Sequence, residues 1–508
     1  MTYCLIDEPW IPVLGPGGGA AQVGLRDALV RAHDFRELRD SSPLVTAALH
    51  RLLLAVLHRA YDGPAESKDW ASMWRAGRFD EGRIGAYLER WRGRFDLFDA
   101  VHPFYQIGRR FDVASKDGRL PVAQLGQELA GGHNSTLFDH TSDESPAVWE
   151  PAVCARRLVA NQAFALGLGV SPKTSTFRKR LNRKDAPLVR GVTVILMGDN
   201  LFQTLMLNLL LYAETGTFPV RKCASDIPAW ERDQPRDPGE HTPEGWLDLL
   251  TWQSRCVRLF PEDGGVRRMA YAQGLSVNAD SRSRDPMWFY EMHDGNAAKI
   301  SPIRLDPEKA LWRSADSLFA FAADGDSNKQ RRPRSFVHAR DMNKRGLFGQ
   351  RNRLRCSIFG IATEPGKAAK PKFWAHDRLP VPTRLLDDED AVGDLRRGLQ
   401  IAEKAGFTLC TSFENIARRL GKSEKGEVRD FVKNLGADLR FWAALDLPFR
   451  EFLDELATDR SKALVAWCDT VRQSAWGAFD SATDGLGGSP RELRARVEAA
   501  RFLEGRLK

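Results

Sequence analysis

The residues with the clearest chemical potential are basic and lie in two short segments. Residues 173–190 hold seven Lys or Arg residues against Asp185 alone, and residues 326–355 hold ten against Asp326 and Asp341. The second segment has a net charge of +8, which equals the formal charge of the whole chain. Such clustering is typical of proteins that bind a phosphate backbone. Solvated surface charge without a partner stays open as the alternative.

Hydroxyl groups accompany the first basic cluster, in a stretch (170–187) that lacks helical or strand periodicity. Charges, hydroxyls and backbone N–H groups can together meet phosphates, and small residues let a backbone approach a groove closely. Phe138, in an earlier polar stretch (131–151), could stack on a base or insert between bases. It could equally anchor that loop in the core.

Residue sets that would support catalysis or metal binding are incomplete. The chain has no Walker A sequence, no Gly-x-Gly-x-x-Gly opening a helix and no His-Glu-x-x-His. Its seven scattered cysteines argue against a disulfide framework or a thiolate zinc site. His133 and His140, beside Asp139, could hold a metal. His376-Asp377 could be half of a metal phosphohydrolase motif, but such a site needs further ligands on buried helices. We therefore expect that the protein is not an enzyme and binds no metal or cofactor. The alternative is a metal-dependent nuclease or phosphohydrolase that uses His376 and Asp377.

The elements that position these segments follow from hydrophobic patterning. A length of 508 residues, 43% hydrophobic and 28% charged, is typical of a globular protein with about two to four domains. Residues 5–13 are expected to form a strand, and Ser42-Pro43 to start a buried helix that runs to Tyr61. Aromatic residues at helical spacing between 70 and 98 indicate core packing. Further helices are expected at 153–168 and 201–215.

The pattern changes near residue 383. β structure is expected to concentrate in 216–366, with strands at 318–322 and 355–363. Four later amphipathic segments, at 391–420, 425–455, 460–482 and 490–508, predict an up-and-down bundle. The predicted fold is therefore α+β, with a mixed α/β N-terminal domain (1–383) followed by a C-terminal four-helix bundle (384–508). No apolar run approaches the roughly 18 residues of a membrane span, and the acidic N-terminus does not resemble a signal peptide. We therefore expect a cytoplasmic protein with no membrane association.

Several short motifs occur in an order shared with a known family. They are LIDEPWIPV at 5–13, Arg51-Leu-Leu-Leu54, HPFYQ at 102–106, Asn134-Ser-Thr-Leu-Phe138, Asn161-Gln-Ala163, Leu188-Val-Arg-Gly191, Asp285-Pro286, Leu311-Trp-Arg313 and Phe373-Trp374. Spread over essentially the whole chain, they resemble the large subunit of the type I-E CRISPR Cascade complex, the CasA family. The opening segment and HPFYQ are the most specific of these motifs.

The resemblance implies a non-catalytic subunit that reads DNA. Members of this family combine a mixed α/β N-terminal domain with a C-terminal four-helix bundle. They recognise the protospacer-adjacent motif in double-stranded DNA through the minor groove, open the duplex with a wedge and dock a helicase-nuclease. The implied partners are target DNA, CRISPR RNA, the backbone, small-subunit and RNA-end-binding proteins of Cascade, and the helicase-nuclease. RNA pairing then reads the sequence, and the protein reads a short motif and backbone charge.

The functional segments of the family can be placed on this chain. The glycine-rich motif loop corresponds to 170–187, where Ser-Pro-Lys-Thr-Ser-Thr and a basic insertion replace glycines. The loop for the RNA end corresponds to 138–149, and the groove-entering lysine to Lys299. The wedge corresponds to 363–366 or, in a rival register, to 352–353. The predicted nucleic-acid-binding residues are Asn134, Phe138, Lys173, Thr174, Arg178, Lys179, Arg180, Arg183, Lys184, Lys299, Arg351, Arg353, Thr363, Glu364, Pro365, Gly366 and Lys367.

Overall fold

A computed structural model describes residues 1–108, 119–126, 147–167, 181–278, 285–293, 296–321, 332–348, 353–363 and 371–507. Of residues 292–293, 296–300 and 353 it describes the backbone alone. The chain divides into two compact units. The first comprises Met1–Pro307, Ala322–Gly349 and Arg355–Arg378, and the second comprises Glu308–Phe321, Gln350–Leu354 and Leu379–Lys508. The predicted boundary between 383 and 384 stays a prediction.

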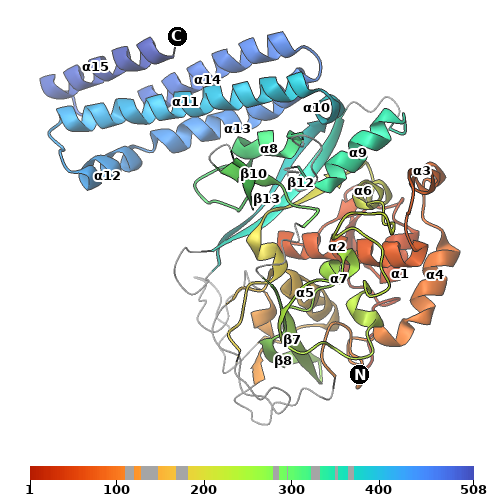
Figure 1. Cartoon of the computed structure of the whole chain (residues 1–508). Coiled ribbons are helices and arrows are strands. Elements are labelled where there is room, and N and C mark those ends of the chain that lie inside the picture. Colours follow the sequence, from red (N-terminus) through yellow and green to blue (C-terminus); the bar gives the residue numbers. More distant parts are fainter. Residues whose placement is uncertain are drawn as a thin grey trace. The chain divides into compact units, whose positions relative to one another are not determined.

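Helix α2 (Pro43–Tyr61) lies in the interior of the first unit, and its residues from Leu44 to His58 are all buried. It begins after Ser42 with proline in the first turn and ends at Asp62, which is left-handed with a φ of 51°. Apolar residues occur on every face of α2, so neighbours can cover it on all sides. Those neighbours are α4 (Glu81–Arg90), α5 (Pro151–Phe164), α6 (Leu201–Asn208) and α7 (Trp246–Leu250) (Figure 1). The predicted helix at 42–61 is thereby confirmed.

The described strands form small sheets with two or three members each. The sheet orders are β2-β1-β3 (Ala20–Val23, Ile11–Leu14, Glu37–Leu38), β4-β8-β7 (Arg119–Pro121, Gly265–Gln273, Arg255–Glu262), β13-β12-β5 (Pro371–Pro382, Arg353–Thr363, Thr193–Met197), β10-β11 (Tyr290–His293, Asn296–Pro302) and β6-β9 (Gly239–His241, Leu275–Val277). The remaining α-helices described in the first unit are α1 (Leu25–Val30), α3 (Ser67–Ala76) and α9 (Arg334–Lys344). The aromatic residues at 70–98 pack as expected, since Trp70 stacks on Trp74 with 5.2 Å between ring centroids.

The second unit is helical. Its long helices α11 (Glu389–Arg419), α13 (Ala437–Leu456), α14 (Arg460–Thr483) and α15 (Pro490–Arg506) run side by side, and α11 contacts each of the other three (Figure 1). The short helices α8 (Ala315–Phe319), α10 (Thr383–Asp387) and α12 (Lys425–Leu435) complete the described α-helices of this unit. Trp312 packs on Phe449 and Trp467 in its core. The predicted α+β class with a helical C-terminal region is confirmed.

Four predicted elements differ from the structure. The strand expected at 5–13 is confined to β1 (Ile11–Leu14), because residues 5–9 form turns in which the N–H groups of Asp7 and Glu8 donate to the carbonyl of Cys4. The segment at 425–455 divides into α12 and α13 because Gly436 adopts a left-handed φ of 64°. The helix at 201–215 already ends at Asn208, whose side chain pairs with both the N–H and the C=O of Leu196 in β5. The strand at 318–322 is wrong, because Leu318 and Phe319 belong to helix α8. A short apolar run does not distinguish a strand from a buried helix. None of the described helices is long and apolar enough to cross a membrane.

Candidate nucleic-acid interface

The structure describes only a minority of the predicted nucleic-acid-binding residues. Arg183, Lys184 and Thr363 are described with their side chains, and Lys299 and Arg353 by backbone alone. The others lie outside the described residues: Asn134, Phe138, Lys173, Thr174, Arg178, Lys179, Arg180, Arg351, Glu364, Pro365, Gly366 and Lys367.

The described residues just before the basic segment (170–187) and those near its end meet at one place, which we call the loop neck (Ala165, Gly167, Asp185 and Ala186). The backbone N–H of Gly167 donates to Oδ1 of Asp185 at 2.7 Å, and the N–H of Ala186 donates to the carbonyl of Ala165 at 2.8 Å. The neck is tight, because a Cβ on Gly167 would lie 2.9 Å from the backbone nitrogen of Asp185. The single acidic residue of the basic cluster thus closes the base of the loop.

Arg183 and Lys184 are tied to strand β8 beside the neck. The guanidinium of half-buried Arg183 lies over the Tyr271 ring, 5.5 Å from its centroid. Burial lowers the pKa of this guanidinium. The backbone N–H of Lys184 donates to Oε1 of Gln273 at 2.7 Å, and Lys184 is exposed. A nucleic-acid contact by either residue stays a prediction.

A network of buried hydrogen bonds lies next to the neck and connects it to helix α5 and to strands β7 and β8. The Tyr271 hydroxyl donates to Oδ1 of Asn161 at 3.0 Å and accepts from Nε of Arg255 at 3.1 Å. A second guanidinium nitrogen of Arg255 donates to the carbonyl of Leu166 at 2.8 Å, next to the neck. Gln162 exchanges two hydrogen bonds with the backbone of Arg255, at 2.8 and 2.9 Å. The Asn161-Gln162 motif therefore holds the first end of the basic loop on the β7–β8 pair.

The hairpin that carries Lys299 is anchored by a buried ion pair. Lys299 belongs to β11, which pairs antiparallel with β10 in a register that sets Met292 opposite Ile300. Just before β10, Oδ2 of Asp285 accepts from Nη1 of Arg51 at 2.8 Å, and both side chains are 3% exposed. Asp285 also accepts from the N–H of Met287 at 2.9 Å. Two motifs that carried the family resemblance, at 51–54 and 285–286, thus meet in the core.

His376 lies in strand β13, which runs from Pro371 to Pro382. Its ring stacks on Phe359 in β12 with 4.6 Å between centroids, and its Nε2 lies 3.1 Å from Oγ of Ser357. Asp377 accepts from the N–H of Arg378. Over the described ranges, no group of three or more His, Cys, Asp and Glu residues could hold a metal ion. The described contacts of His376 are thus those of a sheet residue.

Strands β12 and β13 are neighbours in one sheet and flank the wedge segment. Thr363 is the last residue of β12.

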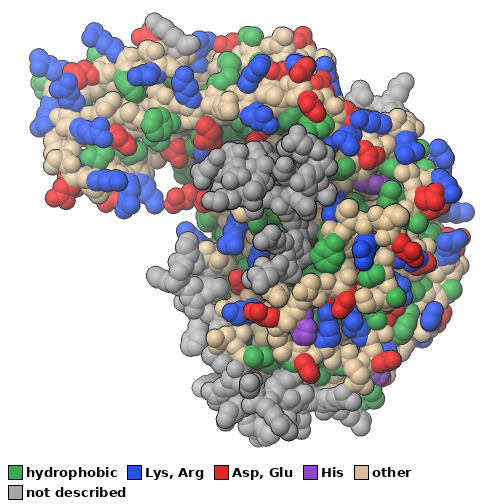
Figure 2. Space-filling view, viewed as in Figure 1, with side chains coloured by type: hydrophobic (Ala, Val, Ile, Leu, Met, Phe, Trp, Pro, Cys, Tyr) green, Lys and Arg blue, Asp and Glu red, His purple; other side chains and the backbone are tan. Residues whose placement is uncertain are grey.

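On the face shown in Figure 2, Lys and Arg side chains of the C-terminal helices are interspersed with Asp and Glu side chains. This part of the described surface therefore shows mixed charge.

Sequence reasoning missed Arg255 and Tyr271. One signal was available for Arg255, because it is a charged residue at the start of the stretch RCVRLF, whose other members are apolar except for Arg258. Its contact with Leu166, 89 residues earlier in the chain, has no counterpart in the sequence pattern.

Comparisons with known proteins agree with this architecture. The model of the family "CRISPR-associated protein Cse1" matches residues 5–478. The CRISPR-associated protein CasA/Cse1 of Thermus thermophilus is 33% identical over 525 residues, which cover 99% of this chain and 97% of that protein. A solved structure of Thermus thermophilus CasA superimposes with a TM-score of 0.81 at 30% identity, covering 99% of this chain and 98% of that one. A chain from a structure titled "CRISPR RNA-guided surveillance complex" has the same fold, with a TM-score of 0.78 at 21% identity and 99% of both chains covered. The protein therefore belongs to the CRISPR-associated Cse1 family.

Proposed function

We propose that this chain is the non-catalytic large subunit of a type I-E CRISPR RNA-guided surveillance complex and recognises the protospacer-adjacent motif in double-stranded DNA. Its partners are the CRISPR RNA, the other Cascade subunits and a recruited helicase-nuclease. Family membership over nearly the whole chain supports the subunit role. The observation that carries the DNA-reading role is the loop neck, which fastens both ends of the most basic part of the N-terminal half at one point.

A fastened neck is useful for DNA binding because it limits the conformations that the basic segment must lose when it binds phosphates. Lysine and arginine in that segment would neutralise backbone phosphates and release counterions. The hairpin of Lys299 would add a further cation, since the buried Arg51–Asp285 pair fixes its start. RNA pairing would supply the sequence specificity once the duplex is open.

Charge reversal tests the role of the basic segment. In the reconstituted complex, the combined variant Lys173→Glu, Arg178→Glu and Lys179→Glu should weaken binding of a motif-containing duplex. Because each phosphate contact contributes about 0.9 to the salt slope, three lost contacts should flatten log Kd against log salt by about 2.7. Lys68→Glu, Arg75→Glu and Arg78→Glu, on the exposed surface of α3 and its C-terminal end, provide a control with the same charge change. The assignment would be rejected if the variant with Lys173→Glu, Arg178→Glu and Lys179→Glu bound the duplex as tightly as the wild type at two salt concentrations.

The neck can be tested without any change of charge. Gly167→Ala places a methyl group 2.9 Å from the Asp185 backbone and should weaken motif binding by displacing the loop. Gly93→Ala is the matched control, because a Cβ there meets no atom within 4 Å. If both variants bind the duplex like the wild type, the neck does not position the reading loop.

The wedge is tested by the rate of duplex opening. Replacing Glu364 and Pro365 with glycine should leave duplex binding intact and slow strand separation, which a fluorescent base analogue beside the motif reports. Opening at the wild-type rate would assign the wedge elsewhere. Comparing helicase-nuclease recruitment by complexes with and without this chain tests the docking role.

A further inference from the structure

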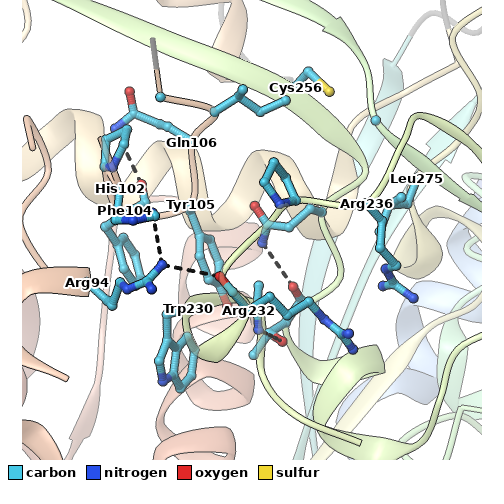
Figure 3. A pocket seen from close by; sticks show the side chains of 18 of the residues that line it. Arg94, His102, Phe104, Tyr105, Gln106, Trp230, Arg232, Arg236, Cys256 and Leu275 are labelled. Atoms are coloured by element: carbon cyan, nitrogen blue, oxygen red, sulfur yellow. Dashed lines mark hydrogen bonds between the residues drawn. The ribbon is translucent and has the colours of Figure 1, made fainter. Parts of the chain in front are cut away.

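The first unit contains a pocket of about 110 Å³ that is separate from the loop neck. Arg255 is shared, because it lines the pocket and also contacts Leu166 beside the neck. Its walls come from the HPFYQ segment and from the segments at 229–236 and 251–256. In Figure 3, Arg94 lies on one side of the pocket and Arg236 on the other, with Tyr105 and Trp230 between them. Tyr105 and Trp230 are nearly fully buried and stack with 6.3 Å between centroids.

Positive charge exceeds negative charge inside this pocket. Asp248 is 2% exposed, and its Oδ1 lies 2.6 Å from Nη2 of Arg236 and 3.3 Å from Nη2 of Arg232. Two guanidinium groups thus share one carboxylate oxygen. Arg94, which also belongs to the wall, pairs with Asp233, a second carboxylate of the wall whose side chain is 90% exposed.

Arg255 adds a further charge to the same wall. It is buried, and its guanidinium nitrogens donate to neutral oxygens of Ser254, Leu166 and Tyr271. Within the described residues, no carboxylate forms an ion pair with it. The wall therefore carries four guanidinium groups and two carboxylates, Asp233 and Asp248, which leaves an excess of two positive charges.

Unused hydrogen-bond donors accompany this excess. The Nε atoms of Arg232 and Arg236 are buried and have no hydrogen-bond partner in the described structure. Arg236 is also held in place, because its guanidinium lies over the Trp252 ring at 4.9 Å. Guanidinium groups with free N–H donors and unbalanced charge are suited to bind the oxygens of a phosphate.

We propose that this pocket binds a phosphate group, either as a free phosphate or at the end of a nucleotide or nucleic-acid strand. A phosphate dianion matches the excess of two charges. The volume is well below the roughly 300 Å³ of pockets that enclose drug-sized ligands, so the pocket holds the phosphate and leaves any attached nucleoside at its mouth. Arg232 and Arg236 supply the N–H donors, and Arg255 supplies the unpaired charge.

Calorimetric titration of the full chain at constant ionic strength tests the proposal. The probes are inorganic phosphate, adenosine 5′-monophosphate, adenosine, and one short DNA strand with a 5′-phosphate or a 5′-hydroxyl. Phosphate-bearing probes should bind and adenosine should not. Binding of inorganic phosphate identifies free phosphate as sufficient, whereas binding of the 5′-phosphorylated strand alone identifies a nucleic-acid end as the ligand.

Variants then assign binding to the pocket. Arg236→Gln should weaken binding by about tenfold or more, and Arg472→Gln on helix α14 should leave it unchanged. If Arg236→Gln fails to fold because Asp248 loses a partner, the double variant Arg232→Lys and Arg236→Lys keeps both charges and removes both Nε donors. It should lose phosphate binding by a similar factor. Absence of binding by every phosphate probe at millimolar concentration, or unchanged affinity in the lysine variant, would overturn the proposal.

Discussion

Replacing Arg51 with methionine should strongly destabilise the first unit. The change removes the ion-pair partner of Asp285 and leaves a carboxylate that is 3% exposed. Breaking a buried pair from one side typically costs about 3–5 kcal/mol, because the remaining charge is buried without compensation. Arg51→Met also removes the hydrogen bond from Nη2 to the Leu249 carbonyl, at 3.2 Å, which is worth about 1 kcal/mol.

The origin of this cost can be separated with a second substitution. Asp285→Asn removes the other charge, so the double variant Arg51→Met and Asp285→Asn no longer buries an unpaired ion. We expect the double variant to be more stable than Arg51→Met by about 2 kcal/mol or more. Lys68→Met is the control, because the Lys68–Glu66 pair is 76% and 64% exposed and should contribute little to stability.

Urea unfolding followed by pulsed hydrogen exchange measures these free energies separately for the two units. Peptides from α2 and β10 report on the first unit, and peptides from α11 report on the second. The reasoning is refuted if Arg51→Met costs no more than Lys68→Met. It is also refuted if the double variant is as unstable as the sum of the two single variants.

Two further predictions concern stability. Burial lowers the pKa to about 4 for the three histidines that are buried in the described structure (His50, His58 and His338), whereas an unfolded histidine titrates near 6.5. The unfolded chain therefore binds more protons between these values, so stability is complete above pH 6.5 and falls as the pH drops towards 4, by up to roughly 3 kcal/mol per histidine. All ten histidines lie in segments of the first unit, so amide protection at pH 5 should fall there and persist in α11, and equal losses in both units would contradict this. In the second unit, Gly398→Ala should cost about 1–3 kcal/mol, because its Cβ would lie 2.6 Å from Phe452 and 3.2 Å from Trp467. Gly393→Ala, which meets no atom within 4 Å on the same helix, should instead stabilise by up to about 1 kcal/mol, and urea midpoints that change alike would argue against tight packing at 398.

Local patterns predicted the helical elements well. Helix α2 follows from apolar periodicity and from the terminal signal Ser42-Pro43, and the long C-terminal helices follow from apolar periodicity. These signals lie within a few residues of the structure that they specify, so no distant contact is needed to recognise them. The order of short motifs likewise indicated the family, which the comparisons confirm.

Features that depend on contacts between distant residues were decided by the tertiary structure. The run at 318–322 has the composition of a strand and becomes helical, and a single left-handed glycine divides the helix expected at 425–455. The Arg51–Asp285 pair joins residues 234 positions apart. A short apolar or polar segment is compatible with several conformations, and the free energy of burial selects among them only when its neighbours are in place.

The candidate site shows the same division. Composition alone identified the basic segments, because charge is a property of each residue and needs no partner to be recognised. Closure of the first segment at Gly167 and Asp185, its support by Arg255 and Tyr271, and the arginine-lined pocket all required the folded chain. Hydrogen bonds and desolvation act over a few ångströms, so their partners are set by proximity in space and not by spacing along the sequence.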